Sequence, residues 1–173
     1  MKCILAYCIA SNGLEEYKSM LKASKSLNIS VIEIKEIVYL AVVNLEVSRV
    51  LPFLIETNKF YSDVLPLVNL NNDNIKGKDI YLELFNEPKY LQDWIYKYVY
   101  DDFYTRNGLS LKERELYTYC FLIVLNYKKK LKEHIKANYK LGNDKSLLTK
   151  VAKQAVPFIG YLNVIEVLEV LDE

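Results

Sequence analysis

The sequence predicts an all-α protein that contains a tandem duplication of one multi-helix unit. Its 173 residues include only five glycines and four prolines, and 51% are hydrophobic, which favours packed helices over disorder. Segment 18–28 (KSMLKASKSLN) is similar to segment 132–142 (KEHIKANYKLG), which begins 114 residues later (132 − 18). We expect a degenerate first unit over residues 1–70, a connecting loop and short segment over 71–84, and a second unit over 85–173.

Matches at this offset extend beyond the two segments. The matched pairs are Lys18/Lys132, Lys22/Lys136, Ala23/Ala137, Leu27/Leu141, Ala41/Ala155, Val42/Val156 and Val50/Val164. Ser30 and Asp144 also correspond, and each can cap the helix that follows it. Cys8 and Cys120 correspond at an offset of 112 (120 − 8), so we expect a two-residue difference in the turn between.

The helix boundaries are clearest in the second half. Ser110 and Glu113 form a capping box that opens a helix buried on nearly every side. Further helices are expected over 128–141, ending at a left-handed Gly142, over 144–158, and from near Gly160 onwards. Residues 71–79 are a loop by composition. An aromatic helix is expected over 88–104, with a buried stripe made of Leu91, Trp94, Ile95, Tyr98 and Val99.

Composition and charge exclude several classes of function. Lys and Arg number 23 and Asp and Glu 22, so no net charge attracts nucleic acid. No apolar run reaches the roughly 18 residues of a membrane span. The N-terminus lacks the cleavage site of a secretory signal, and the three cysteines (Cys3, Cys8 and Cys120) form neither a disulfide framework nor a metal motif. We therefore expect a cytoplasmic protein with buried thiols and no metal.

His134 and Glu115 form the candidate site. His134 is the sole histidine and follows Glu115 by nineteen residues (134 − 115). The imidazole shares an apolar helix face, at i, i+3 and i+4 spacing, with Leu131, Ile135, Asn138 and Leu141. The matching positions of the first unit hold Met20 and Cys3, so both polar groups occur in one copy and are absent from the other. A base and a carboxylate in one apolar interior are suited to proton transfer.

Two structural explanations compete with this assignment. A single histidine on an apolar face is usually a core side chain that bonds a backbone carbonyl, and Glu115 can simply favour the positive end of its helix. A row of lysines at i+4 spacing also lies on the helix of His134. We interpret this row as a solvated face and not as a nucleic-acid patch; it consists of Lys128, Lys132, Lys136 and Lys140.

Four segments of the second half occur in an order that is typical of a known family. They are an L-S-x-K-x-R-E-L helix start at 109–116, His134 on the next helix, a turn at 137–142, and a V-x-x-x-G-Y-x-N close at 156–163. With these motifs the chain resembles the carboxymuconolactone decarboxylase and alkyl hydroperoxidase D superfamily, well over 85–173 and weakly over 1–60. The resemblance implies an all-α fold and self-association, as a trimer whose six units form a ring.

The resemblance also distinguishes two branches of that family. In the peroxidase-linked branch a glutamate and a histidine act with a CxxC pair, and Glu115 and His134 keep the spacing of that branch. The cysteine positions hold Tyr127 and Lys130, which cannot exchange disulfides, so CxxC-type peroxidase reduction is excluded. The decarboxylase branch lacks the cysteines and acts on a small carboxylated lactone. It implies a lyase that needs no cofactor, with Glu115 and His134 as the catalytic pair.

A carboxylated substrate would need a cation, and the candidates are Arg114, Lys130 and Arg49. Tyr119 and Tyr127 are candidate hydrogen-bond donors to a developing enolate. Two alternatives stay open. One is a non-catalytic oligomeric or ligand-binding descendant of the family. The other is an atypical thiol antioxidant protein that uses Cys120 or Cys8.

Overall fold

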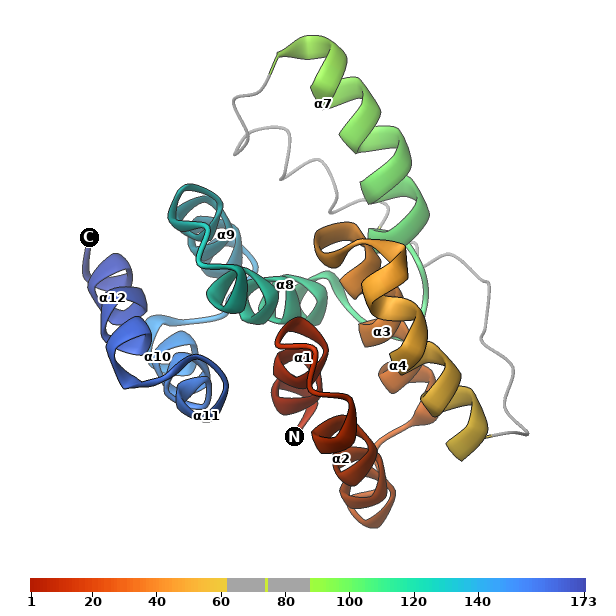
Figure 1. Ribbon diagram of the computed structural model, residues 1–173. Coiled ribbons are helices and arrows are strands. Elements are labelled where there is room, and N and C mark those ends of the chain that lie inside the picture. The colour runs from red at the N-terminus through yellow and green to blue at the C-terminus, as the bar shows by residue number, and fades with distance from the viewer. Residues whose placement is uncertain (62–73, 75–87) are drawn as a thin grey trace.

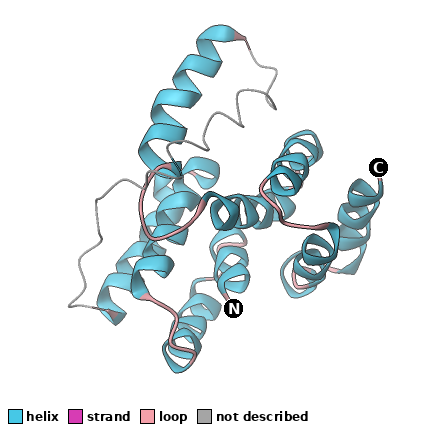
Figure 2. Ribbon diagram, turned by 180° about the vertical axis from the view of Figure 1, so that it is seen from behind, coloured by secondary structure: helices cyan, strands magenta, loops and turns pink. Residues whose placement is uncertain are grey.

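The computed structural model describes residues 1–61, 74 and 88–173. All regular secondary structure in these residues is helical, which confirms the predicted all-α class (Figure 2). Apart from Asn74, the expected loop at 71–79 and connecting segment at 71–84 lie outside the described residues. Among the described helices, none has both the length and the apolar character that crossing a membrane requires.

The described helices fall into two groups. The first contains α1 (Lys2–Ala10), α2 (Leu14–Ser26), α3 (Val31–Leu45) and α4 (Val47–Phe60). The second contains α8 (Leu111–Leu125), α9 (Lys128–Lys140), α10 (Lys145–Lys153), α11 (Val156–Ile159) and α12 (Tyr161–Asp172). Between them α7 (Lys89–Ile95) continues directly into a π-helix, η1 (Tyr96–Tyr104).

The same pairs of helices pack together in both groups. In the first, α1 packs on α2 and α3, and α4 packs on the same two helices; in the second, α8 and α12 each pack on α9 and α10. The groups meet at the centre of the molecule, where α1 and α3 both contact α8 (Figure 1). The helix formed by α7 and η1 projects from this centre, and its η1 part contacts α3.

Capping boxes open the two helices that join the groups. Ser110 and Glu113 bond each other's backbone N–H at the start of α8, as predicted, and Ser30 and Glu33 do the same at the start of α3. Lys2 bridges both glutamates, with its Nζ 2.8 Å from Glu33 and 2.9 Å from Glu113. One lysine of α1 therefore connects the N-termini of α3 and α8.

Left-handed backbone recurs at the 114-residue offset. The helices α2, α3 and α4 begin at residues 14, 31 and 47, and α9, α10 and α12 begin at 128, 145 and 161. The positive-φ residues are Asn12 (61°), Asn28 (54°) and Glu46 (73°) in the first group and Asn126 (52°), Gly142 (83°) and Gly160 (82°) in the second. Since the turns at Asn12 and Asn126 keep the offset of 114, the expected two-residue difference in that turn is wrong.

The helix expected over 144–158 is divided in two. The helix α10 ends at Lys153, and the short α11 begins at Val156. The cause is Pro157, which has no N–H to donate and whose ring would clash with the carbonyl of Lys153 in a continuous helix.

The buried stripe predicted for the aromatic helix is also partly wrong. Trp94 is 56% exposed and Tyr98 45%, whereas Tyr100 and Tyr104 are buried. For the residues of η1 the reason is its wider turn, in which the N–H of Thr105 bonds the carbonyl of Tyr100, five residues earlier, at 3.1 Å. This turn brings a different set of side chains to the inner face.

Candidate functional site

Glu115 and His134 meet in the interior, at the contact between α8 and α9. His134 Nδ1 is hydrogen-bonded to Glu115 Oε1. Glu115 has no exposed surface and His134 retains 8%. A carboxylate accepts hydrogen bonds and a ring N–H donates them, so the geometry suits a ring that carries its hydrogen on Nδ1.

Two asparagines fix the backbone behind this pair. Asn138 Nδ2 donates to the carbonyl of His134 at 2.8 Å and to that of Glu115 at 3.2 Å. Asn143 Nδ2 in turn donates to Asn138 Oδ1 at 2.7 Å and to the carbonyl of Lys112 at 2.9 Å. Asn138 thus ties α8 to α9 at the level of the pair, which sets the position of the imidazole relative to the carboxylate.

His134 also lines a pocket of about 320 Å³, whereas Glu115 lies behind it, outside the lining. The pocket walls come from both halves of the chain and from the helix between them. Apolar side chains make up most of these walls, with Ile95 from α7, Val99 from η1, Leu122 and Leu125 from α8, and Val43 from α3. A mostly apolar pocket with few polar groups is the usual form of a small-molecule site.

Outside η1, three polar side chains accompany His134 in the lining. Lys130 reaches the pocket from α9 and is paired with Glu133 at 2.8 Å. Tyr127 stands at the start of that helix and is 53% exposed. Asn44 comes from α3, and its amide nitrogen is buried without a hydrogen-bond partner among the residues that the structure describes. A buried donor without an acceptor is costly, so Asn44 provides a place for a ligand oxygen.

Two tyrosines of η1 complete the pocket. Burial raises the pKa of Tyr100 and of Tyr104 far above the usual value, and the negative charge of Glu115 contributes to both shifts. Tyr104 is hydrogen-bonded to Thr118 at 2.8 Å. Both phenols therefore stay protonated beside Glu115. The spacing of the tyrosines at 96, 100 and 104 is the sequence signal that could have identified this face.

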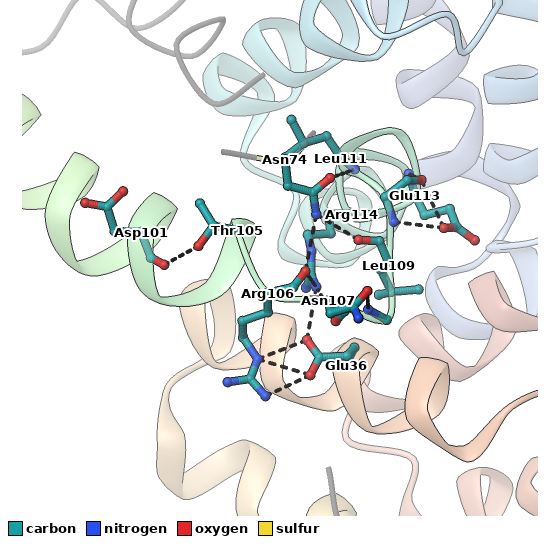
Figure 3. Close-up of polar contacts among 12 residues, drawn as sticks. Glu36, Asn74, Asp101, Thr105, Arg106, Asn107, Leu109, Leu111, Glu113 and Arg114 are labelled. Carbon is teal, nitrogen blue, oxygen red and sulfur yellow. Dashed lines mark hydrogen bonds and ion pairs between the residues drawn. The ribbon is translucent and has the colours of Figure 1, made fainter. Parts of the chain in front are cut away.

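Three of the candidate residues lie away from the pocket. Arg114 is fully buried against Glu36 and donates to the carbonyls of Arg106 (2.7 Å) and Asn107 (3.2 Å), which makes it part of a structural network (Figure 3). The hydroxyl of Tyr119 donates to the carbonyl of Leu148 at 3.4 Å. Arg49 donates to the carbonyl of Ala10 in the first group. Of the four tentative substrate-binding residues, the pocket includes Tyr127 and Lys130 and excludes Arg114 and Tyr119.

Within the described ranges, no three His, Cys, Asp or Glu side chains converge as metal ligands would. Comparison with known proteins adds no assignment, because no protein-family model and no curated protein sequence matches the chain.

Proposed function

We propose that the pair and its pocket catalyse proton transfer on a small carboxylated molecule, as a lactone decarboxylase or a related lyase does. The observation that carries this proposal is the buried bond between Glu115 and His134 on the wall of a largely apolar pocket. The bond to Glu115 uses Nδ1 and orients the ring. The opposite edge of the imidazole, which bears Nε2, would then move a proton to or from the substrate.

The other polar groups of the pocket suit the substrate class. Lys130 would bind the carboxylate and Asn44 would donate to one of its oxygens or to a carbonyl oxygen. The protonated phenol of Tyr100 would stabilise charge that develops on a carbonyl oxygen. Glu115 would stabilise the imidazolium that forms when His134 takes up a proton.

We further propose that the chain is a tandem member of the superfamily that it resembles. The helix starts and the left-handed residues that recur at 114 residues support a duplication of one unit. His134 corresponds to Met20, which lies 114 residues earlier. Only the second copy therefore has a histidine at this position, as expected if only that copy carries the site. Since Asn44 and Val43 of the first copy line the pocket, the first copy would serve as part of its wall. Assembly into a trimer belongs to the same proposal.

The proposal is tested by measuring how fast protons of the substrate exchange with the solvent. The purified protein is incubated in D₂O with a panel of small carboxylated lactones and keto acids, and NMR follows deuterium uptake next to the carbonyl and loss of CO₂. His134→Asn keeps a donor for Glu115 and removes the ring, so it should lower the rate by about 100-fold or more. Tyr119→Phe, outside the pocket, is the matched control and should leave the rate unchanged.

The alternative is a protein that only binds its ligand. The same panel separates the two functions, because each compound is also tested for binding by its effect on the Trp94 fluorescence of the pocket wall. Compounds that bind without deuterium uptake or CO₂ release would support the binding protein and refute the lyase.

A further inference from the structure

Cys3 and Cys120 lie far apart in the sequence and side by side in the fold. Cys3 belongs to α1 and Cys120 to α8, and these two helices pack directly against each other. Their side chains interact, because each thiol shifts the pKa of the other. Both cysteines are reduced in the structure.

The two thiols differ in environment. Cys3 is half-buried, and the hydrogen bond from Cys120, assisted by the charge of Lys2, lowers its pKa despite burial. Cys120 is completely buried, and burial raises its pKa far above the usual value. A thiol with thiolate character and some exposure reacts first with an oxidant, and an adjacent cysteine can then resolve the product.

We propose that Cys3 and Cys120 form a redox-sensitive pair, which hydrogen peroxide converts into a disulfide across the contact between α1 and α8. This site is independent of the proposed proton-transfer function. It would allow peroxide to join the two helical groups covalently through the helices at their centre.

The reaction has two steps. The thiolate of Cys3 attacks one oxygen of hydrogen peroxide, the O–O bond breaks, and Cys3 becomes a sulfenic acid while hydroxide takes up a proton to give water. The sulfur of Cys120 then loses its proton and displaces the hydroxyl from Cys3, so that an S–S bond forms, the S–O bond breaks and a second water leaves. In total two thiols are oxidised by two electrons and one peroxide is reduced to two waters.

The experiment treats the native protein with hydrogen peroxide, blocks residual thiols with an alkylating reagent and analyses a non-reducing digest by mass spectrometry. Trypsin gives peptide 3–18, which contains Cys3 and Cys8, and peptide 115–128, which contains Cys120. Cleavage by chymotrypsin after Tyr7 separates Cys3 from Cys8. The expected product is a Cys3–Cys120 linkage that dithiothreitol reverses, with Cys8 still alkylated.

Three variants provide the controls. Cys8→Ala should form the linkage at an unchanged rate. Cys120→Ser should instead accumulate a sulfenic acid on Cys3 that a dimedone probe captures, and Cys3→Ser should leave Cys120 reduced. In the oxidised wild type the melting temperature should rise, because the linkage connects two distant parts of the chain. Oxidation confined to Cys8, over-oxidation of Cys3 without a linkage, or three thiols that all remain alkylatable would each overturn the proposal.

Discussion

Glu36 on α3 and Arg114 on α8 form an ion pair that joins the two helical groups, with Glu36 Oε2 3.0 Å from Arg114 Nη2 and the side chains only 1% and 0% exposed. Arg106 donates to the same carboxylate from the loop before α8, at 2.8 to 3.1 Å (Figure 3). One carboxylate thus pairs with two guanidinium groups. Burial lowers the pKa of Arg114, which reflects the cost of holding its charge away from water.

Glu36→Gln should therefore destabilise the protein strongly. The variant leaves the buried charge of Arg114 without its partner, which costs about 3–5 kcal/mol in comparable buried pairs. Urea unfolding followed by far-UV circular dichroism measures the loss. Glu56→Gln is the matched control, because it breaks a pair with Lys59 whose lysine is 67% exposed, and should change stability by less than about 1 kcal/mol. Equal effects of the two variants would contradict the assignment of Arg114 to a structural network.

Glu46 and Gly160 give a reciprocal prediction about backbone strain. Glu46 has φ 73° and ψ 144°, and Gly160, 114 residues later, has φ 82° and ψ 161°. This region is almost restricted to glycine, and a side chain there costs about 1–3 kcal/mol. Glu46→Gly should stabilise the protein by about 1 kcal/mol after the entropy of glycine is subtracted. Gly160→Ala should destabilise it by a similar or larger amount, and both are measured by thermal unfolding. A destabilising Glu46→Gly would show that the strain is absent.

Glu113 predicts how stability depends on pH. Burial alone would raise its pKa, but hydrogen bonds from Lys2 and Ser110 and the charge of Lys2 lower the pKa below the usual 4.5. A carboxylate with a lowered folded-state pKa adds stability above its unfolded pKa and loses it as pH falls through the folded value. Glu113→Gln, which keeps the capping box, should cost less than about 1 kcal/mol at pH 7. The difference from wild type should vanish below the folded pKa, as urea unfolding over a pH series would show.

Asn44 predicts a conflict between stability and binding. Its amide nitrogen is buried without a partner among the described residues and lies in the pocket lining. Asn44→Leu removes this unsatisfied donor and should raise the free energy of unfolding by about 1 kcal/mol. The same variant should weaken the binding of small carboxylates. Ser24→Ala is the control: it removes a buried hydroxyl that lies outside this pocket and has no hydrogen-bond partner in the described part of the chain, and it should leave binding unchanged. Loss of stability in Asn44→Leu would refute the assignment of Asn44 as a ligand donor.

The parts of the molecule that the sequence predicted are local in origin. Ser110 with Glu113 lie within one helical turn, and the apolar face that includes Leu131 and His134 follows from spacing alone, so both predictions are confirmed. Contacts between distant segments were not predictable in this way. The pairing of Cys3 with Cys120 depends on how α1 packs on α8, and no pattern along the chain encodes it.

The candidate site shows the same division. Glu115 and His134 lie on α8 and α9, which are consecutive in the chain and pack against each other. The spacing of the two residues in the sequence could therefore suggest that they meet. Asn44 enters the pocket from α3 of the other helical group, and Tyr100 enters because η1 adopts a π-helix instead of an α-helix. Periodicity that assumes an α-helix placed Tyr98, which is exposed, on the buried face of this segment.

The most direct test of the Glu115–His134 pair is the tautomer of the imidazole. His134 is the sole histidine, so a two-bond ¹H–¹⁵N correlation spectrum gives its ring nitrogens without assignment. In spectra recorded at alkaline pH, the neutral ring should carry its hydrogen on Nδ1, because that nitrogen bonds Glu115. Glu115→Gln still offers an oxygen acceptor and should keep this tautomer, whereas Glu115→Leu should convert the ring to the Nε2–H form. An Nε2–H ring in the wild-type protein, or a spectrum indifferent to Glu115→Leu, would contradict the pair and the proton-transfer function that depends on it.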